Sequence, residues 1–224
     1  SLSEKKAPYN APLNDYIFVR RVYVDLTGTI PSYDQVQAFV QSNNPYKRTR
    51  LINELISTEG YVSHNYNYFA DLLRIQSTVP GEDLRMDAFS SWLKDAIRTN
   101  KPYNRMVYDM ISATGRMQEN PAVGYHLRDI GMKLDHTSFM AKIFLSKDIT
   151  CAQCHDHPFE DWTQMDFYSL AAFLGEMETK APKKPSGKNA KKKKTMRVSY
   201  TPAQVKMRRF LTSWGFELAI AERE

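Results

Sequence analysis

Two cysteines and a histidine stand together in the segment Cys151-Ala152-Gln153-Cys154-His155, and their spacing points directly to chemistry. On one turn of helix, positions i, i+3 and i+4 share a face, so both thiols and the imidazole are expected to point the same way. The pattern C-x-x-C-H is typical of c-type haem attachment. Each thiol forms a thioether with one vinyl group, and the histidine supplies the proximal nitrogen to the iron. The spacing therefore predicts one covalent haem c, with His155 as the proximal ligand.

Three alternatives remain for the same residues. The thiols are incidental, or they form a redox-active pair, although no alternation of strands and helices surrounds them as in thioredoxin-like folds. A zinc site using Cys151, Cys154, His155 and His157 offers four nitrogen and sulfur ligands. Those four ligands lie within seven residues, whereas zinc sites normally draw on two separated pairs.

The residues after the motif are candidate neighbours of the cofactor. His157 lies two residues past the proximal ligand and would point away from the same iron, so we expect it to support the site or to bond a haem propionate or Asp161. Phe159 and Trp162 are the aromatic residues nearest His155 in this direction and are expected to line the haem.

A sixth iron ligand is not singled out by the sequence. The candidates are His136, Met132, Met140 and Met177. His64 and His126 are expected at the surface or in loops. A methionine at helical spacing more often fills a core than binds a metal, so a five-coordinate iron remains open.

Helical periodicity dominates the chain, and no alternating strand of useful length appears. Apolar residues recur at helical spacing, as in the set predicted to face inward, Met106, Val107, Met110 and Ile111. Thr27-Gly28-Thr29 is expected to end the first helix, and Ser32 and Thr163 are expected to cap later ones. The expected helices cover about 13–25, 46–57, 61–76, 86–98, 102–111, 130–145 and 163–173, with one that starts after Ser32 and includes Val40, and a last one from Pro202. Residues 115–124 are expected to form a loop. The predicted fold is all-α, an irregular multi-helix bundle with the C-x-x-C-H turn between two helices.

The net charge of +6 is concentrated in one segment. Eight lysines lie between Lys180 and Lys194, and removing them from +6 leaves −2. Nucleic acid is therefore not an expected partner, and the segment, which also contains prolines and glycine, is expected to be a mobile linker. We divide the chain into a helical haem-binding domain (1–179), a Lys-rich linker (180–195) and a C-terminal helical segment (196–224).

The length and composition are those of a globular protein, with 42% hydrophobic and 25% charged residues. No apolar run reaches the roughly 18 residues that a membrane-spanning helix needs. Two cysteines are too few for a disulfide framework.

The stretch CAQCHDHPFEDWTQMDFYSLAAFL resembles the hallmark of the planctomycete cytochrome-associated domain, a secreted domain of unknown function. The segments RRVYVDLTGTIPSYDQVQAFV and AFSSWLKDAIRTNKPYNRMVYDMISATG also resemble parts of that family, in the same order. The resemblance covers about Tyr16 to Leu174. It implies a bacterial periplasmic or secreted protein beside redox or polysaccharide-degrading systems, and carries over Cys151, Cys154, His155 and His157 as motif residues.

We therefore expect a monohaem electron carrier or relay rather than an enzyme, with an acidic redox partner that the lysines would attract. One alternative is a haem enzyme or ligand sensor with an open iron position. Another is a non-haem metal-binding or interaction module of a polysaccharide-processing system. The sequence does not indicate an oligomeric state.

Overall fold

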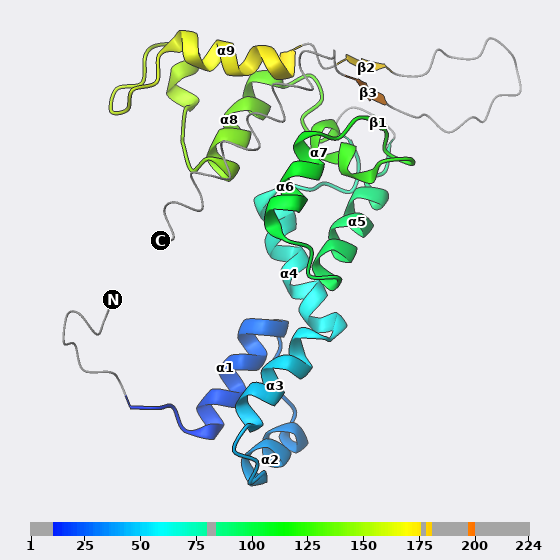
Figure 1. The fold of residues 1–224 in the computed structure, drawn as a ribbon, viewed down its shortest axis with the longest axis vertical. Coiled ribbons are helices and arrows are strands. Elements are labelled where there is room, and N and C mark those ends of the chain that lie inside the picture. The colour runs from blue at the N-terminus through cyan, green and yellow to red at the C-terminus, as the bar shows by residue number, and fades with distance from the viewer. Residues whose placement is uncertain (1–10, 80–83, 176–177, 181–196, 200–224) are drawn as a thin grey trace, which may run out of the picture. The chain divides into compact units, whose positions relative to one another are not determined.

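The structure is a computed structural model that describes residues 11–79, 84–175, 178–180 and 197–199 (Figure 1). It is mostly helical, which confirms the all-α expectation. The chain divides between residues 67 and 68 into two compact units, unit 1 (Ser1–Asn67) and unit 2 (Tyr68–Glu224). The sequence did not predict this division inside residues 1–179.

Unit 1 contains α1 (Asp15–Thr27), α2 (Tyr33–Gln41), α3 (Lys47–Ile56) and the first part of α4 (Glu59–Leu72). The predicted cap of α2 is confirmed: the Ser32 hydroxyl accepts a hydrogen bond from the Gln35 amide, and the Gln35 side chain accepts one from the Ser32 amide. Both α2 and α3 pack on α1. Asp15 joins α1 to α3 through ion pairs with Lys47 (2.7 Å) and Arg48 (2.8 Å).

The predicted stop of the first helix is also confirmed. Gly28 ends α1 in the left-handed conformation, with φ of 67°, and its amide donates to the Val24 carbonyl. A Cβ atom at Gly28 would lie 2.5 Å from Nδ1 of His64, so the position needs glycine for its conformation and for the close approach of His64. His64 is half-buried on α4.

The helix predicted at about 61–76 ends at Leu72 instead. Arg74 has a left-handed φ of 52°, and the Ile75 amide donates to the Ala70 carbonyl (2.8 Å), a hydrogen bond typical of a helix end. This conformation costs about 1 kcal/mol in a residue other than glycine. An ion pair between Arg74 and Asp129 holds the arginine there.

The first part of unit 2 contains α5 (Asp87–Arg98), α6 (Tyr103–Ile111), the 3₁₀ helix η1 (Pro121–Val123) and α7 (Gly124–Leu127). Its fully buried side chains include Phe89, Leu93, Met110 and Tyr125. The loop predicted for residues 115–124 is wrong at both ends, because Gly115–Arg116 forms a short strand and the chain is helical from Pro121 onward. Ala122–Asp129 is also continuously buried. A Cβ at Gly124 would lie 2.5 Å from the Phe89 Cβ, which shows how closely α7 packs on α5.

The second part of unit 2 contains α8 (Lys133–Phe144), the 3₁₀ helix η2 (Thr150–Gln153) and α9 (Gln164–Gly175). These three elements pack on one another, and Figure 1 shows α9 lying across α8. Thr163 caps α9 as predicted, because its hydroxyl accepts from the Asp166 amide (3.1 Å). Cys151 to His155 therefore lies between two helices, as the sequence suggested.

Three short strands form an antiparallel sheet in the order β1-β3-β2: β1 (Gly115–Arg116), β2 (Glu178–Lys180) and β3 (Arg197–Ser199). Val198 pairs with Gly115 on one side and with Thr179 on the other. The sequence placed residues 197–199 in a helical segment, but pairing with two neighbours satisfies their backbone groups as a strand. Residues 181–196 of the lysine-rich segment, and the helix expected from Pro202, lie outside the described residues.

Candidate functional site

The segment Cys151–His155, hereafter the motif turn, is one compact turn of chain. The amides of Cys154 and His155 both donate to the Cys151 carbonyl, at 3.2 and 3.3 Å. Both thiols and the His155 imidazole are exposed, and neither cysteine forms a disulfide. The buried residues at the turn are Ile149 and Ala152, at 1% and 0% exposure. The turn is thus anchored by Ile149 and by a variable residue of the C-x-x-C-H pattern, while the two cysteines and the histidine face solvent.

Asp148 fixes the beginning of the turn. Its carboxylate accepts hydrogen bonds from the Thr150 hydroxyl (2.7 Å) and amide (3.3 Å), and pairs with Lys142 of α8 at 2.6 Å. The hydrogen bond from Lys142 and those from Thr150 lower the pKa of Asp148 to about 2. The carboxylate is therefore ionised in mild acid and keeps η2 attached to α8.

One nitrogen of the His155 ring is already hydrogen-bonded within the protein. Its Nδ1 lies 2.7 Å from the Asp156 carbonyl oxygen, and because a carbonyl only accepts, Nδ1 carries the proton. In a neutral imidazole the other nitrogen, Nε2, then has the lone pair that binds a metal. Metal-binding histidines commonly make this kind of hydrogen bond with their second nitrogen.

His157 has a different role. Its Nδ1 accepts hydrogen bonds from the amides of Phe159 (3.2 Å) and Glu160 (3.1 Å), so its proton lies on Nε2 in the neutral ring. The His157 amide also donates to the Trp162 carbonyl at 2.7 Å. His157 therefore shapes the loop after the motif turn, and neither of its nitrogens presents a lone pair to a metal.

The predicted aromatic neighbours lie in the loop that His157 closes. Phe159 is 91% exposed, and Trp162 is half-buried. Two more large side chains on the first turns of α9 are exposed, Met165 at 74% and Tyr168 at 43%. Of these side chains, Tyr168 lies against the motif turn, because its hydroxyl donates to the Gln153 carbonyl at 3.2 Å.

The candidate sixth ligands do not gather at the motif turn. Gln153 of the turn contacts Ser138 of α8 at 3.0 Å, which identifies the face of α8 that meets the turn. His136 and Met140 each lie two residues from Ser138, so they are about 200° round the helix, on the opposite face. Met132 is 42% exposed at the beginning of α8, and Met177 lies outside the described residues.

His126 is a correction to the sequence analysis. It was expected at the surface or in a loop, but it is fully buried on α7, with Nδ1 at 3.1 Å from Nε2 of His136. Nδ1 of His136 in turn lies 2.8 Å from the Asp129 carboxylate. Because an ionised carboxylate only accepts, His136 donates to Asp129, and in its neutral form it accepts from His126. Both ring nitrogens of His136 are therefore engaged.

Two arginines complete this buried network, which consists of Arg74, His126, Arg128, Asp129 and His136. Arg128 donates to Asp129 at 2.9 Å and also to the Leu73 carbonyl, and Arg74 pairs with the other carboxylate oxygen. Burial raises the pKa of the Asp129 carboxyl, but the hydrogen bond from His136 and the guanidinium charges lower it by more.

The buried network is closed to solvent except at Arg74, whose side chain is 36% exposed. Asp129 is 3% exposed and Arg128 is 2% exposed, so no substrate reaches them. Nη2 of Arg128 has no hydrogen-bond partner among the described residues. The network joins the end of α4, the chain after α7 and the beginning of α8. It fixes the position of α8, the helix on which the motif turn rests. We therefore assign the network a structural role. No periodic pattern could have revealed it, because Arg74 and Asp129, which pair in it, lie 55 residues apart.

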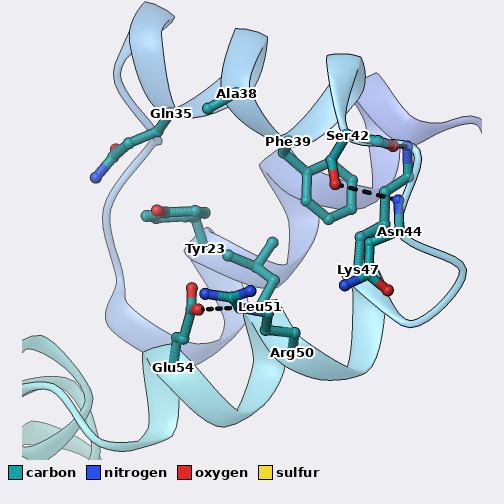
Figure 2. A pocket seen from close by; sticks show the side chains of 10 residues that line it. All are labelled: Tyr23, Gln35, Ala38, Phe39, Ser42, Asn44, Lys47, Arg50, Leu51 and Glu54. Atoms are coloured by element: carbon teal, nitrogen blue, oxygen red, sulfur yellow. Dashed lines mark hydrogen bonds and ion pairs between the residues drawn. The ribbon is translucent and has the colours of Figure 1, made fainter.

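A pocket of about 330 Å³ lies in unit 1 (Figure 2). Gln35 and Ala38 of α2 line one side of the pocket, and Arg50 and Glu54 of α3 line the other. Tyr23 and Leu51 lie between these two sides. Its charged groups are already paired, Arg50 with Glu54 at 2.7 Å and Lys47 with Asp15 at 2.7 Å. Burial raises the pKa of the Tyr23 hydroxyl, and the Glu54 charge adds to this. The pocket is a gap between two helices packed on α1, and it presents no unpaired charge to a ligand.

Within the part of the chain that the structure describes, no three His, Cys, Asp or Glu side chains are grouped to hold a metal ion. The zinc alternative needs four such ligands from Cys151 to His157, and the His157 hydrogen bonds give it no support. A haem needs only one protein nitrogen and the two thiols from this turn. Among the described residues, no helix has the length and apolar character to cross a membrane.

Comparisons with known proteins identify a family for this chain but do not identify an activity. The family model PSCyt2, described as a protein of unknown function (DUF1549), matches residues 1–179. No curated protein matches the chain, and no solved structure matches it.

Proposed function

Because this chain belongs to the PSCyt2 family, whose description gives no activity, we propose its function from the motif turn. The turn carries one covalently attached haem, and unit 2 is an electron-transfer module. Cys151 and Cys154 provide the two thioether bonds, and His155 provides the proximal nitrogen. Haem iron held in this way supplies a reversible one-electron couple.

One observation carries the proposal: the His155 ring is exposed beside two exposed thiols on the same turn, with Nδ1 donating to the Asp156 carbonyl. The chain's own residues therefore orient the ring, hold the proton on Nδ1 and leave the Nε2 lone pair for iron. The same hydrogen bond makes the ring a better electron donor, which is one way in which a protein tunes a haem.

The surroundings of the turn suit a large apolar plane. Phe159, Met165 and Tyr168 are exposed. Exposed apolar groups next to a cofactor site are candidates to cover the cofactor and remove its surface from water. A haem that is covered on one face by these side chains and exposed at one edge would exchange electrons readily with a partner protein.

The first experiment measures covalent haem. The protein is produced with cytochrome c maturation machinery, and the pyridine haemochrome spectrum is recorded after acidic organic extraction. Haem that stays on the polypeptide, with the spectrum of a double thioether, is expected. Cys151→Ala and Cys154→Ala should each leave one attachment at most. Extraction of all haem from the unmodified protein would refute the proposal.

An open iron site is the second candidate, because both nitrogens of His136 are engaged in the buried network and His136 and Met140 face away from the turn. A haem with only His155 as protein ligand is high-spin and binds carbon monoxide, which is the property of a ligand sensor or haem enzyme. An electron carrier with a sixth ligand, such as Met132 or Met177, is low-spin and binds it poorly. Spectra of the ferrous protein with and without carbon monoxide distinguish the two.

The compartment and partner follow from the same chemistry. Haem attachment to C-x-x-C-H takes place outside the bacterial cytoplasm, so we expect a periplasmic or secreted protein associated with cytochromes. The lysines of residues 180–194 would attract an acidic redox partner. Replacing Lys191 to Lys194 by serine should slow reduction by such a partner at low salt and have little effect at high salt, as stopped-flow absorbance would show. An unchanged rate at low salt contradicts this role.

A further inference from the structure

Gln153, the second variable residue of C-x-x-C-H, holds the motif turn to both neighbouring helices. Its side-chain amide donates to the Ser138 hydroxyl of α8 at 3.0 Å. Its backbone carbonyl accepts two hydrogen bonds from α9, one from the Gln164 side chain and one from the Tyr168 hydroxyl, both at 3.2 Å. Gln153 is half-buried, whereas the cysteines on either side are exposed.

These three contacts restrain the backbone between the two thiols. The contact with Ser138 fixes the side of the turn that faces α8, and the two donors from α9 fix the direction of the carbonyl. The turn's own hydrogen bonds, from Cys154 and His155 to the Cys151 carbonyl, are long at 3.2 and 3.3 Å. A turn of this length has weak local stability, so external contacts decide how often it opens.

We infer that Gln153 is a positioning residue, which with Ser138, Gln164 and Tyr168 keeps Cys151, Cys154 and His155 presented together for one porphyrin. This inference rests on the proposed function for its chemistry, although the restraint itself is a property of the protein alone. Two-point attachment needs both thiols near their vinyl groups at once, and pre-organisation by fixed contacts is the general means to achieve it. A looser turn would more often leave one thiol unreacted.

The restraint is tested first without haem. Amide hydrogen exchange of Cys154 and His155 is measured by NMR in the haem-free protein and in its Gln153→Ala and Ser138→Ala variants. Loss of one hydrogen bond should accelerate exchange at these amides by about two- to tenfold. The urea unfolding midpoint should change little, which separates local opening from general destabilisation. Gln118→Ala, a change at an exposed glutamine elsewhere in unit 2, is the matched control and should leave both amides unaffected.

The second measurement is the proportion of doubly attached haem after production with maturation machinery. Gln153→Ala should yield about twofold less of it than Gln118→Ala, with more of the single-thioether spectrum. Because Gln153→Ala removes a half-buried side chain, Ser138→Ala, which removes only the acceptor hydroxyl, provides a second variant.

The outcomes separate the two proposals. Unchanged exchange at Cys154 and His155 in both Gln153→Ala and Ser138→Ala overturns the restraint. Faster exchange with normal double attachment overturns the positioning role. Absence of haem from the unmodified protein overturns the proposed function and, with it, the positioning role, whereas faster exchange would still establish the restraint. Faster exchange together with reduced double attachment supports the inference.

Discussion

Unit 2 holds histidines in two contrasting settings. In the buried network, His126 and His136 are at 0% exposure, and each ring bonds another side chain. In the motif turn, His155 is exposed, and Nδ1 of its ring donates to the Asp156 backbone carbonyl. Burial and partners, rather than residue type, decide which imidazole is available for chemistry. The buried pair stabilises the fold, and the exposed ring keeps a lone pair for a ligand.

The largest change in stability predicted from this contrast is at Asp129. Asp129→Asn removes the charge that two guanidinium groups and His136 share, and it leaves buried donors without an ionised acceptor. Removing one partner of a buried ion pair typically lowers the free energy of unfolding by about 3–5 kcal/mol. We expect a loss of this size in the free energy of unfolding, measured by urea titration. The exposed Asp34→Asn should cost less than about 0.5 kcal/mol, and equal effects of the two changes would contradict the structural role.

The next largest effect is expected at Gly124, which immediately precedes Tyr125 and His126. Gly124→Ala would bring a methyl group to 2.5 Å from the Phe89 Cβ. Overpacking of this kind costs about 1–3 kcal/mol. Gly60→Ala, whose new atom would have its nearest contact at 3.4 Å, should change stability by less than about 0.5 kcal/mol. Thermal unfolding of the two variants side by side measures the difference.

Acid should weaken the motif turn through Asp148. The pKa of this carboxyl, lowered to about 2 in the folded protein, lies below its ordinary value of 3.8. A lowered folded-state pKa stabilises the fold above the ordinary value, and the contribution disappears as pH falls through the folded value. Side-chain NMR of Asp148 should give a midpoint near pH 2, with the Thr150 amide signal moving in parallel. An Asp148 midpoint near pH 4 would contradict the hydrogen bonds to Thr150 and Lys142.

The smallest effect on stability is expected where the chemistry is proposed. The double variant Cys151→Ser, Cys154→Ser changes two exposed side chains and should alter the free energy of unfolding of the haem-free protein by less than about 0.5 kcal/mol. The same variant should lose all covalent haem. Extensive unfolding of this variant would show that the thiols support the core, and the distinction between the two regions would fail.

Helices with strong local signals could be predicted from the sequence. Ser32 marked the beginning of α2, and Gly28 marked the end of α1. Met106, Val107, Met110 and Ile111 are buried on α6 as expected. Such signals lie within a few residues of the feature that they predict.

The errors lie where distant residues decide the structure. Residues 115–124 were expected to form a loop, and His126 was expected at the surface or in a loop. Ala122–Asp129 is instead buried, because Arg74, 55 residues before Asp129, and His136, seven residues after it, satisfy the Asp129 carboxylate. At the motif turn the identities of Cys151, Cys154 and His155 were evident, but the contacts of Gln153 with Ser138, Gln164 and Tyr168 depend on how α8 and α9 pack.

Phe159 also makes the loop after the motif turn a site for selective cleavage. The loop is closed by the His157–Trp162 hydrogen bond, and Phe159 stands 91% exposed within it. Exposed loop tips are where proteases cut folded proteins. Chymotrypsin should therefore nick the native chain after Phe159 while the packing of α8 and α9 holds the fragments together. The chain would then separate, only on denaturation, into one fragment that retains both cysteines and a second that begins just before α9.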